Sequence, residues 1–144
     1  MKNEFLLEPE QSEAMGINAV ASLGPKQRRE YKNAPLSKIA EECLPADTKS
    51  VVVLSNLAVS PDARRRGVAK ALCNEVEALA EDWGYNQLHL LVEEGNTVGR
   101  ALYEGKLGYE IVAKVEAETA LRPDIETGEF KEVQVDSLVM AKSL

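Results

Sequence analysis

Residues 59–70 read VSPDARRRGVAK, and this junction decides the fold. It follows the apolar run Ser50 to Val59 and leads into Gly67 to Trp83, where apolar residues recur at helical spacing. The run predicts a buried strand, and the periodic segment predicts an amphipathic helix that stops at Gly84. The charged residues of this helix are expected on its solvent face: Lys70, Glu75, Glu77, Glu81 and Asp82.

Further elements follow in the same alternation. Gln87 to Val92 predicts a second core strand, and Asn96 to Lys106 predicts a second helix. Tyr109 to Val115 and Val133 to Met140 predict the last two strands. Alternating strands and helices require crossover connections, so the fold class is mixed α/β.

The first third of the chain is less regular. Glu4 to Glu8 and Ile17 to Leu23 are interpreted as two short strands that form a hairpin. Residues 24–49 are charged and contain three prolines, which favours an inserted loop. Within it, Leu36 to Leu44 predicts a short amphipathic helix.

Composition excludes several classes of protein. With 144 residues and 44% apolar content, the chain fits one domain with its own core. A net charge of −7 argues against general nucleic-acid binding and suits a cationic acceptor, although ordinary solubility explains it equally well. Cys43, Cys73 and the single histidine, His89, indicate neither a disulfide framework nor a metal site. We expect no membrane span, and Met1 to Glu4 lacks a targeting signal.

The start of the 67–83 helix is a candidate phosphate site. Unpaired backbone N–H groups and the positive end of the helix dipole attract anions there. Gly67 lets its backbone approach a ligand closely, and Ala69 keeps the first turn uncrowded. Four cations add charge at the same point in an acidic protein: Arg64, Arg65, Arg66 and Lys70. The alternative is a solvated strand-to-helix turn.

Two segments resemble the GNAT superfamily of N-acetyltransferases. Leu54 to Ala69 is similar to that family's central strand, phosphate loop and helix start. Asn96 to Tyr103, followed by Gly108-Tyr109, is similar to its second signature, a helix that ends in Leu-Tyr before Gly-aromatic. The resemblance covers residues 50–115 and implies one N-acetyltransferase domain over residues 1–144. Its central mixed sheet would be splayed between the fourth and fifth strands, with the N-terminal strand and helices missing or reduced.

The resemblance implies a role for each matching residue. The pantetheine arm of acetyl-CoA would pair with the backbone of Leu57, Ala58 and Val59, and the amide of Val59 or its neighbour would polarise the thioester carbonyl. The residues expected at the pyrophosphate are Arg64, Arg65, Arg66, Gly67, Val68, Ala69 and Lys70. Asn96, Thr97 and Val98 would line the far side of the pantetheine.

Tyr103 matches the residue that protonates the departing thiolate, and a phenol is suitably matched to a thiol leaving group. The alternative is a core aromatic on the inner face of its helix. Direct transfer in a ternary complex needs no protein nucleophile, so Cys73 is interpreted as a packing residue. No metal is implied.

The general base stays unassigned. Some protein N-terminal acetyltransferases carry a histidine five residues before the asparagine, but Leu91 occupies that position. His89 lies on the same strand face and is more often a packed histidine than a base. Glu93 or Glu94 could accept the proton of the amine through a water molecule; the alternative is that both are ordinary surface glutamates.

The resemblance predicts transfer of acetyl from acetyl-CoA to a primary amine, with a protein lysine or N-terminus as candidate acceptor. The rival is a non-catalytic acyl-CoA-binding or regulatory module. Ser55 to Val59 and the ending Leu138 to Lys142 look similar to plastid-type plant and algal members. A cytoplasmic location is expected, or a plastid one if a transit segment has been removed.

Two features depart from the family pattern. The stretch from Tyr103 to Gly108 is one residue longer than usual, with Gly105 as the extra residue. Gly99 replaces the commoner alanine, which lowers the stability of the helix by about 1 kcal/mol. The last turn of this helix is therefore expected to bulge or to end early.

Overall fold

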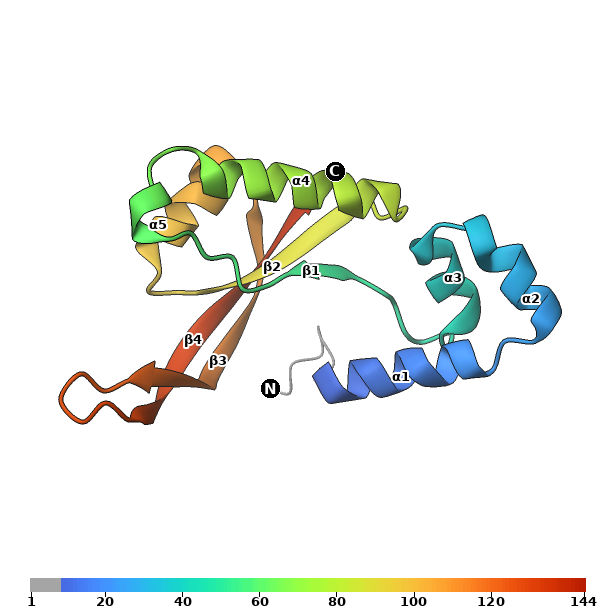
Figure 1. The fold of residues 1–144 in the computed structure, drawn as a ribbon, viewed down its shortest axis with the longest axis horizontal. Coiled ribbons are helices and arrows are strands. Elements are labelled where there is room, and N and C mark those ends of the chain that lie inside the picture. The colour runs from blue at the N-terminus through green and yellow to red at the C-terminus, as the bar shows by residue number, and fades with distance from the viewer. Residues whose placement is uncertain (1–8) are drawn as a thin grey trace.

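The computed structural model describes residues 9–144, and its elements are shown in Figure 1. The helical segments are α1 (Pro9–Ala21), α2 (Pro25–Glu30), η1 (Tyr31–Asn33), α3 (Leu36–Cys43), η2 (Pro61–Ala63), α4 (Val68–Asp82), α5 (Thr97–Arg100) and η3 (Ala101–Lys106). The strands are β1 (Val52–Leu54), β2 (Gln87–Glu93), β3 (Glu110–Pro123) and β4 (Phe130–Ser143). None of the described helices is both long and apolar enough to cross a membrane.

The four strands form one mixed sheet in the order β1-β2-β4-β3. β1 runs parallel to β2, whereas β4 is antiparallel to both of its neighbours. Pairing between β1 and β2 stops at Leu54↔Leu90, although β2 continues beside β4 as far as Glu93. The two parallel strands therefore part after three residue pairs, which confirms the predicted mixed α/β class and its splayed sheet.

The core lies between the sheet and the helices that cover one of its faces, with α4 lying across the strands in Figure 1. Alternate residues of β2 point into it, as expected for a strand with a side-chain period of two. The buried cluster comprises Cys73, Ala80, Leu88, Leu90, Val92, Tyr103, Leu107, Tyr109, Leu138 and Met140. Each fully buried leucine contributes about 1.5–3 kcal/mol relative to exposure.

The buried face of α4 differs from the predicted one. Cys73 and Ala80 are buried, whereas Leu72 and Leu79 are 41% and 44% exposed. Glu77 was expected on the solvent face and instead has a side chain only 14% exposed, because it is paired with Lys142 of β4. A cation on a neighbouring strand cannot be read from helical periodicity, so the pattern placed Glu77 wrongly.

The end of α4 follows the prediction at Gly84. Gly84 has φ +86°, and its amide donates to the carbonyl of Glu81 at 2.8 Å. The amide of Tyr85 donates to the carbonyl of Ala80 at 3.0 Å, which completes a Schellman motif. The amide of Ser37 donates to Trp83 at 3.0 Å, so this helix end also anchors α3.

We expect Gly84→Ala to lower the free energy of unfolding by about 2 kcal/mol or more, since a left-handed L-residue alone costs roughly 1–2 kcal/mol. The new Cβ would also lie 2.3 Å from Oγ of Ser37 and 2.9 Å from Cβ of Pro35. Urea denaturation followed by circular dichroism measures the loss. Gly128→Ala is the matched control, because Gly128 has φ +73° but no atom within 4 Å of an added Cβ. Equal losses in both variants would contradict the contact between α3 and α4.

The predicted hairpin over residues 4–23 is wrong where the structure describes it. Ile17 to Leu23 was expected to be a strand, but Pro9–Ala21 is the helix α1; Glu4 to Glu8 lies outside the described residues. The chain before Ile17 is rich in helix formers, with proline at the first helical position, and these outweigh the β-branched residues. The expected helix within residues 24–49 corresponds to α3, but Pro25–Asn33 is helical as well.

Candidate active site

The parting of β1 and β2 leaves a stretch of backbone without a sheet partner. Asn56, with φ +58°, turns the chain away from β2. In the described part of the chain, no backbone hydrogen bond reaches the amides of Leu57, Ala58 or Val59. Leu57 packs against the core cluster that contains Tyr103. These amides are therefore available to a ligand lying between the two strands.

The loop that follows has a defined backbone. Pro61–Ala63 forms the 3-10 turn η2, and Nε of Arg64 donates to the carbonyl of Val59 at 3.0 Å. Arg65 has φ +62°, and Gly67 caps α4 with φ +78°. No side chain caps this helix start, so its first amides point outward unpaired. This is the anion-binding geometry expected from the sequence.

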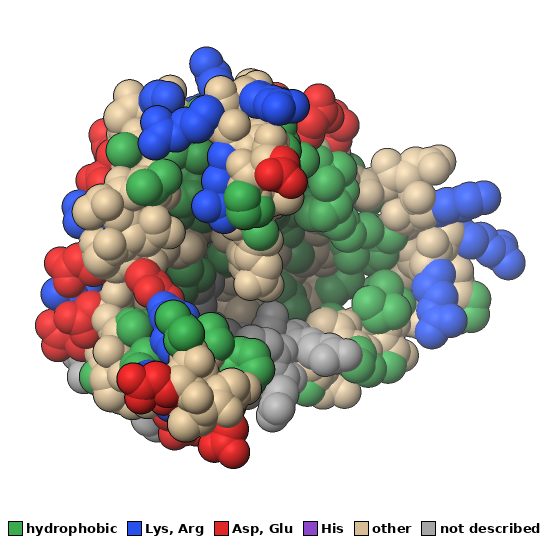
Figure 2. Space-filling view, turned by 60° about the vertical axis from the view of Figure 1, so that its left-hand side comes forward, with side chains coloured by type: hydrophobic (Ala, Val, Ile, Leu, Met, Phe, Trp, Pro, Cys, Tyr) green, Lys and Arg blue, Asp and Glu red, His purple; other side chains and the backbone are tan. Residues whose placement is uncertain are grey.

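The cations of the loop are exposed. Arg64, Arg65, Arg66 and Lys70 all lie on the surface, and none forms an ion pair with a described residue. Figure 2 shows basic side chains gathered at the top of the view, where α4 begins. The Arg64 side chain folds back and hydrogen-bonds to the backbone of its own loop, so it stabilises the loop conformation. The other three cations stay exposed, so they can contact a ligand.

The second predicted segment begins at the end of β2. Asn96 caps α5, since its Oδ1 accepts from the amide of Gly99 at 2.9 Å. A Cβ at Gly99 would lie 2.8 Å from Nδ2 of Asn96, so the glycine makes room for this cap. Thr97 and Val98 are exposed, and Val98 is 75% exposed.

Tyr103 lies in a π-turn. The segment Ala101–Lys106 is π-helical, and the amide of Leu107 donates to the carbonyl of Leu102, five residues earlier, at 3.0 Å. The extra residue at Gly105 is thus absorbed as the expected bulge, a form common at functional sites. Tyr103 is 9% exposed, and its ring meets that of Tyr109 edge-on at 6.0 Å between centroids. Burial, with the nearby Cys73 thiol, raises the pKa of Tyr103, so its hydroxyl is protonated at neutral pH.

Three residues that sequence analysis did not select form a polar network beside Tyr103. The Tyr109 hydroxyl donates to Oε1 of Glu77 at 3.1 Å, and Nζ of Lys142 lies 2.8 Å from Oε2 of the same carboxylate. Nζ of Lys142 also lies 5.8 Å from the centroid of the Tyr109 ring. The only signal in the sequence was the aromatic residue after Gly108; Glu77 and Lys142 are 65 residues apart in the chain.

The candidate general bases are either ion-paired or directed to the sheet face opposite α4. His89 is 6% exposed and alternates with Leu88 and Leu90, so it points to the sheet face opposite α4. Burial lowers its pKa, and the imidazole is neutral. Glu93 pairs with Arg122, and Glu94 pairs with Lys114 at 2.9 Å. Cys73 is fully buried and its thiol pKa is raised by burial, which suits a packing residue.

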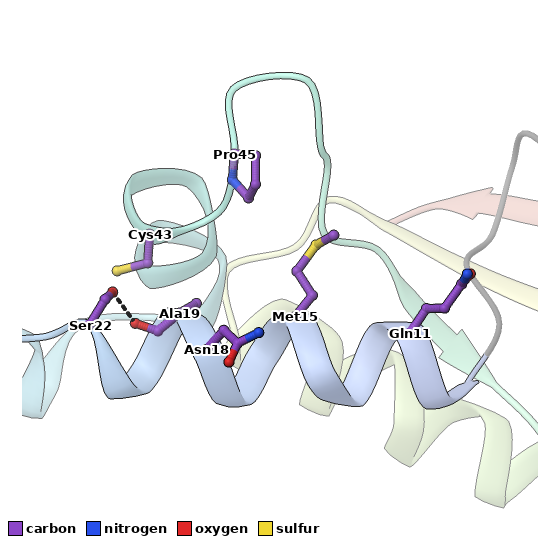
Figure 3. Close-up of a pocket in the computed structure, with 7 residues that line it drawn as sticks. All are labelled: Gln11, Met15, Asn18, Ala19, Ser22, Cys43 and Pro45. Atoms are coloured by element: carbon purple, nitrogen blue, oxygen red, sulfur yellow. Dashed lines mark hydrogen bonds between the residues drawn. The ribbon is translucent and has the colours of Figure 1, made fainter.

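The described part of the structure has two hollows of note. One of about 530 Å³ lies between α1 and the end of α3 and contains none of the predicted site residues (Figure 3). Another of about 390 Å³ lies just before Asn96 and is lined by Glu93, Glu94, Gly95, Val135 and Asp136. The described residues contain no cluster of three or more metal-ligating side chains.

The sequence profile of the Acetyltransferase (GNAT) family matches residues 31–109, which is over half of the chain and spans both the loop and Tyr103. The chain belongs to the GNAT acetyltransferase family. Comparison with curated proteins gives no significant match.

Solved acetyltransferases share the fold of this GNAT chain. Naa20 from Chaetomium thermophilum in complex with a bisubstrate analogue is 24% identical, with a TM-score of 0.52 over 64% of this chain and 46% of that one. A GNAT family acetyltransferase from Elizabethkingia anophelis with acetyl-CoA bound is 19% identical, with a TM-score of 0.51 over 64% and 60%. The NatB acetyltransferase complex bound to a bisubstrate inhibitor is 32% identical, with a TM-score of 0.50 over 64% and 50%. The chain spans 46% to 60% of the length of these three structures.

Proposed function

We propose that this GNAT protein transfers the acetyl group of acetyl-CoA to a primary amine. The observation that carries the proposal is the start of α4 at Gly67, which no side chain caps and which follows the loop leaving the parted strands β1 and β2. The exposed cations Arg65, Arg66 and Lys70 surround that helix start and suit a pyrophosphate. Family membership supports acetyl-CoA as the donor.

The proposed chemistry is direct attack in a ternary complex. The neutral amine attacks the thioester carbonyl carbon, the carbon–sulfur bond breaks, and the amine gives up a proton to solvent water, from which the Tyr103 phenolate is reprotonated. The amide of Val59 or its neighbour stabilises the oxyanion. Tyr103 protonates the departing thiolate from its buried, protonated hydroxyl. Asn96, Thr97 and Val98 line the far side of the pantetheine, opposite Leu57 and Ala58.

A cationic acceptor fits the acidic end of β2. The hollow before Asn96 is lined by Glu93, Glu94 and Asp136, and these three carboxylates outnumber the two cations of the described chain that pair with them, Lys114 and Arg122. The chain as a whole carries a net charge of −7. Both features attract an ammonium group before it loses its proton. A peptide N-terminus and a protein lysine are the two candidate acceptors.

A second candidate function is a non-catalytic acyl-CoA-binding module. It is favoured by the state of the candidate bases, because Glu93 and Glu94 are ion-paired and His89 points to the opposite sheet face. This candidate predicts cofactor binding without turnover.

The test combines calorimetric titration of acetyl-CoA with an assay of thiol release. Peptides with a free N-terminus, with a free lysine only, or with both amines blocked serve as acceptors. We expect micromolar binding and amine-dependent thiol release. Binding without release by any free amine would favour the module, and no binding by the folded protein would reject both functions.

A further inference from the structure

The Glu77 carboxylate joins three elements behind Tyr103. It lies on α4, accepts from the hydroxyl of Tyr109 just before β3, and pairs with Lys142 near the end of β4. The Glu77 and Lys142 side chains are only 14% and 26% exposed. Each of the two carboxylate oxygens has one partner, so the Tyr109 hydroxyl and the Lys142 ammonium share one carboxylate.

Tyr109 connects this network to Tyr103 in two ways. The two rings meet edge-on at 71°, a geometry that favours one relative orientation. The amide of Tyr109 also donates to the carbonyl of Tyr103 at 2.9 Å. Tyr109 is only 2% exposed, and the Glu77 carboxylate directs its hydroxyl. Burial, together with this carboxylate, raises the pKa of Tyr109. A ring held at its far end by a hydrogen bond can therefore fix the ring that rests against it.

The π-turn makes such support necessary. A π-turn replaces the regular i to i−4 hydrogen bonds of an α-helix with wider ones, so the backbone alone positions Tyr103 less firmly. Proton transfer to a leaving group depends on hydrogen-bond distance, and a displacement of about 1 Å can cost about a hundredfold in rate.

We propose that Glu77 is a positioning residue that acts through Tyr109 to hold the hydroxyl of Tyr103 at the site of proton transfer. Lys142 pairs with the part-buried Glu77 carboxylate and holds it in place. This inference deepens the proposed acetyl transfer and rests on it.

A double-mutant cycle tests the coupling. Tyr109→Phe keeps the ring but removes the donor to Glu77, and we expect it to lower kcat about tenfold with little change in KM for acetyl-CoA. In a Tyr103→Phe background, the same substitution is expected to change kcat by less than about twofold, because the group it positions is already gone. Glu77→Ala should behave like Tyr109→Phe, and Glu77→Gln, which keeps an acceptor for Tyr109, should lose less.

Glu81→Gln is the control, since Glu81 is exposed one turn further along the same helix. Losses of equal size with and without the Tyr103 hydroxyl would overturn the proposal, as would unchanged kcat in folded Tyr109→Phe. Tyr109→Phe carries the test alone if Glu77→Ala does not fold.

A second readout does not depend on turnover. Tyrosine ring NMR across a pH titration reports the pKa of Tyr103, which burial raises. If the Tyr103 ring loses its fixed, buried position in Tyr109→Phe, this pKa should fall toward the ordinary tyrosine value. A shifted pKa in a protein without thiol release would reject the proposed function but retain the positioning. An unchanged Tyr103 ring signal and pKa would reject the positioning even in an active enzyme.

Discussion

The double variant Arg66→Glu, Gly67→Asp is expected to weaken acetyl-CoA binding by at least about a hundredfold, which corresponds to about 2.7 kcal/mol. Gly67 caps α4 in the left-handed region at φ +78°, and an added Cβ there would meet no atom within 4 Å. The left-handed backbone strains any added side chain, but Asp is among the L-residues that visit this region, so the loss arises mainly from charge. Two carboxylates would replace one cation beside unpaired amides that stabilise an anion.

Calorimetric titration of acetyl-CoA into wild type and variant measures this effect. Arg29→Glu on α2 is the control, because it reverses the charge of an exposed arginine outside the loop and should leave the affinity within about twofold. Wild-type affinity should also fall as salt is added, since exposed cations are screened. Unchanged binding by the folded double variant would show that the loop does not hold the pyrophosphate.

The second half of the fold was predictable because its local signals agree with its packing. The helix from Val68 and the stop at Gly84 each combine a hydrophobic period with a matching boundary residue. The strand predicted as buried over Ser50 to Val59 is correct only over Val52–Leu54, which is half-buried, because the chain leaves β2 after Leu54. The bulge near Gly105 was also expected, because an extra residue in a helix must be absorbed by a wider turn. In such segments, periodicity and capping specify the same structure.

The errors arose where burial depends on distant residues. Glu77 looks like a solvent-facing helix residue until Lys142 is brought beside it by the sheet. The last two strands were predicted at about half their length, because the outer part of the Glu110–Pro123 and Phe130–Ser143 hairpin has no apolar alternation. Its half-buried positions on β3 include the charged residues Glu118 and Arg122. Its exposed tip includes Ile125, which is 98% exposed.

Tyr103→Phe is expected to lower kcat about a hundredfold while acetyl-CoA affinity changes by less than about twofold. The phenol donates only as the thiolate leaves, so its loss affects the transition state and not the bound substrate. This loss of kcat is expected at the low end of the range of about 10²–10⁴-fold for general acids, because a thiol with a pKa of about 8.5 can also leave as the unprotonated thiolate. Tyr85→Phe is the control, since the Tyr85 hydroxyl hydrogen-bonds only to Ser50 among the described residues.

The pH dependence of kcat shows whether Tyr103 acts as a general acid or only as a packed core aromatic. A general acid acts in its protonated form, so activity is present below its pKa and is lost as the pH rises through it. Burial raises the pKa of Tyr103, which places the alkaline fall in kcat above the ordinary tyrosine value of about 10. Tyr103→Phe should remove this fall along with most of the rate. Full activity and an unchanged alkaline limb in the variant would instead assign Tyr103 to packing alone, beside Tyr109 and Cys73 in the core.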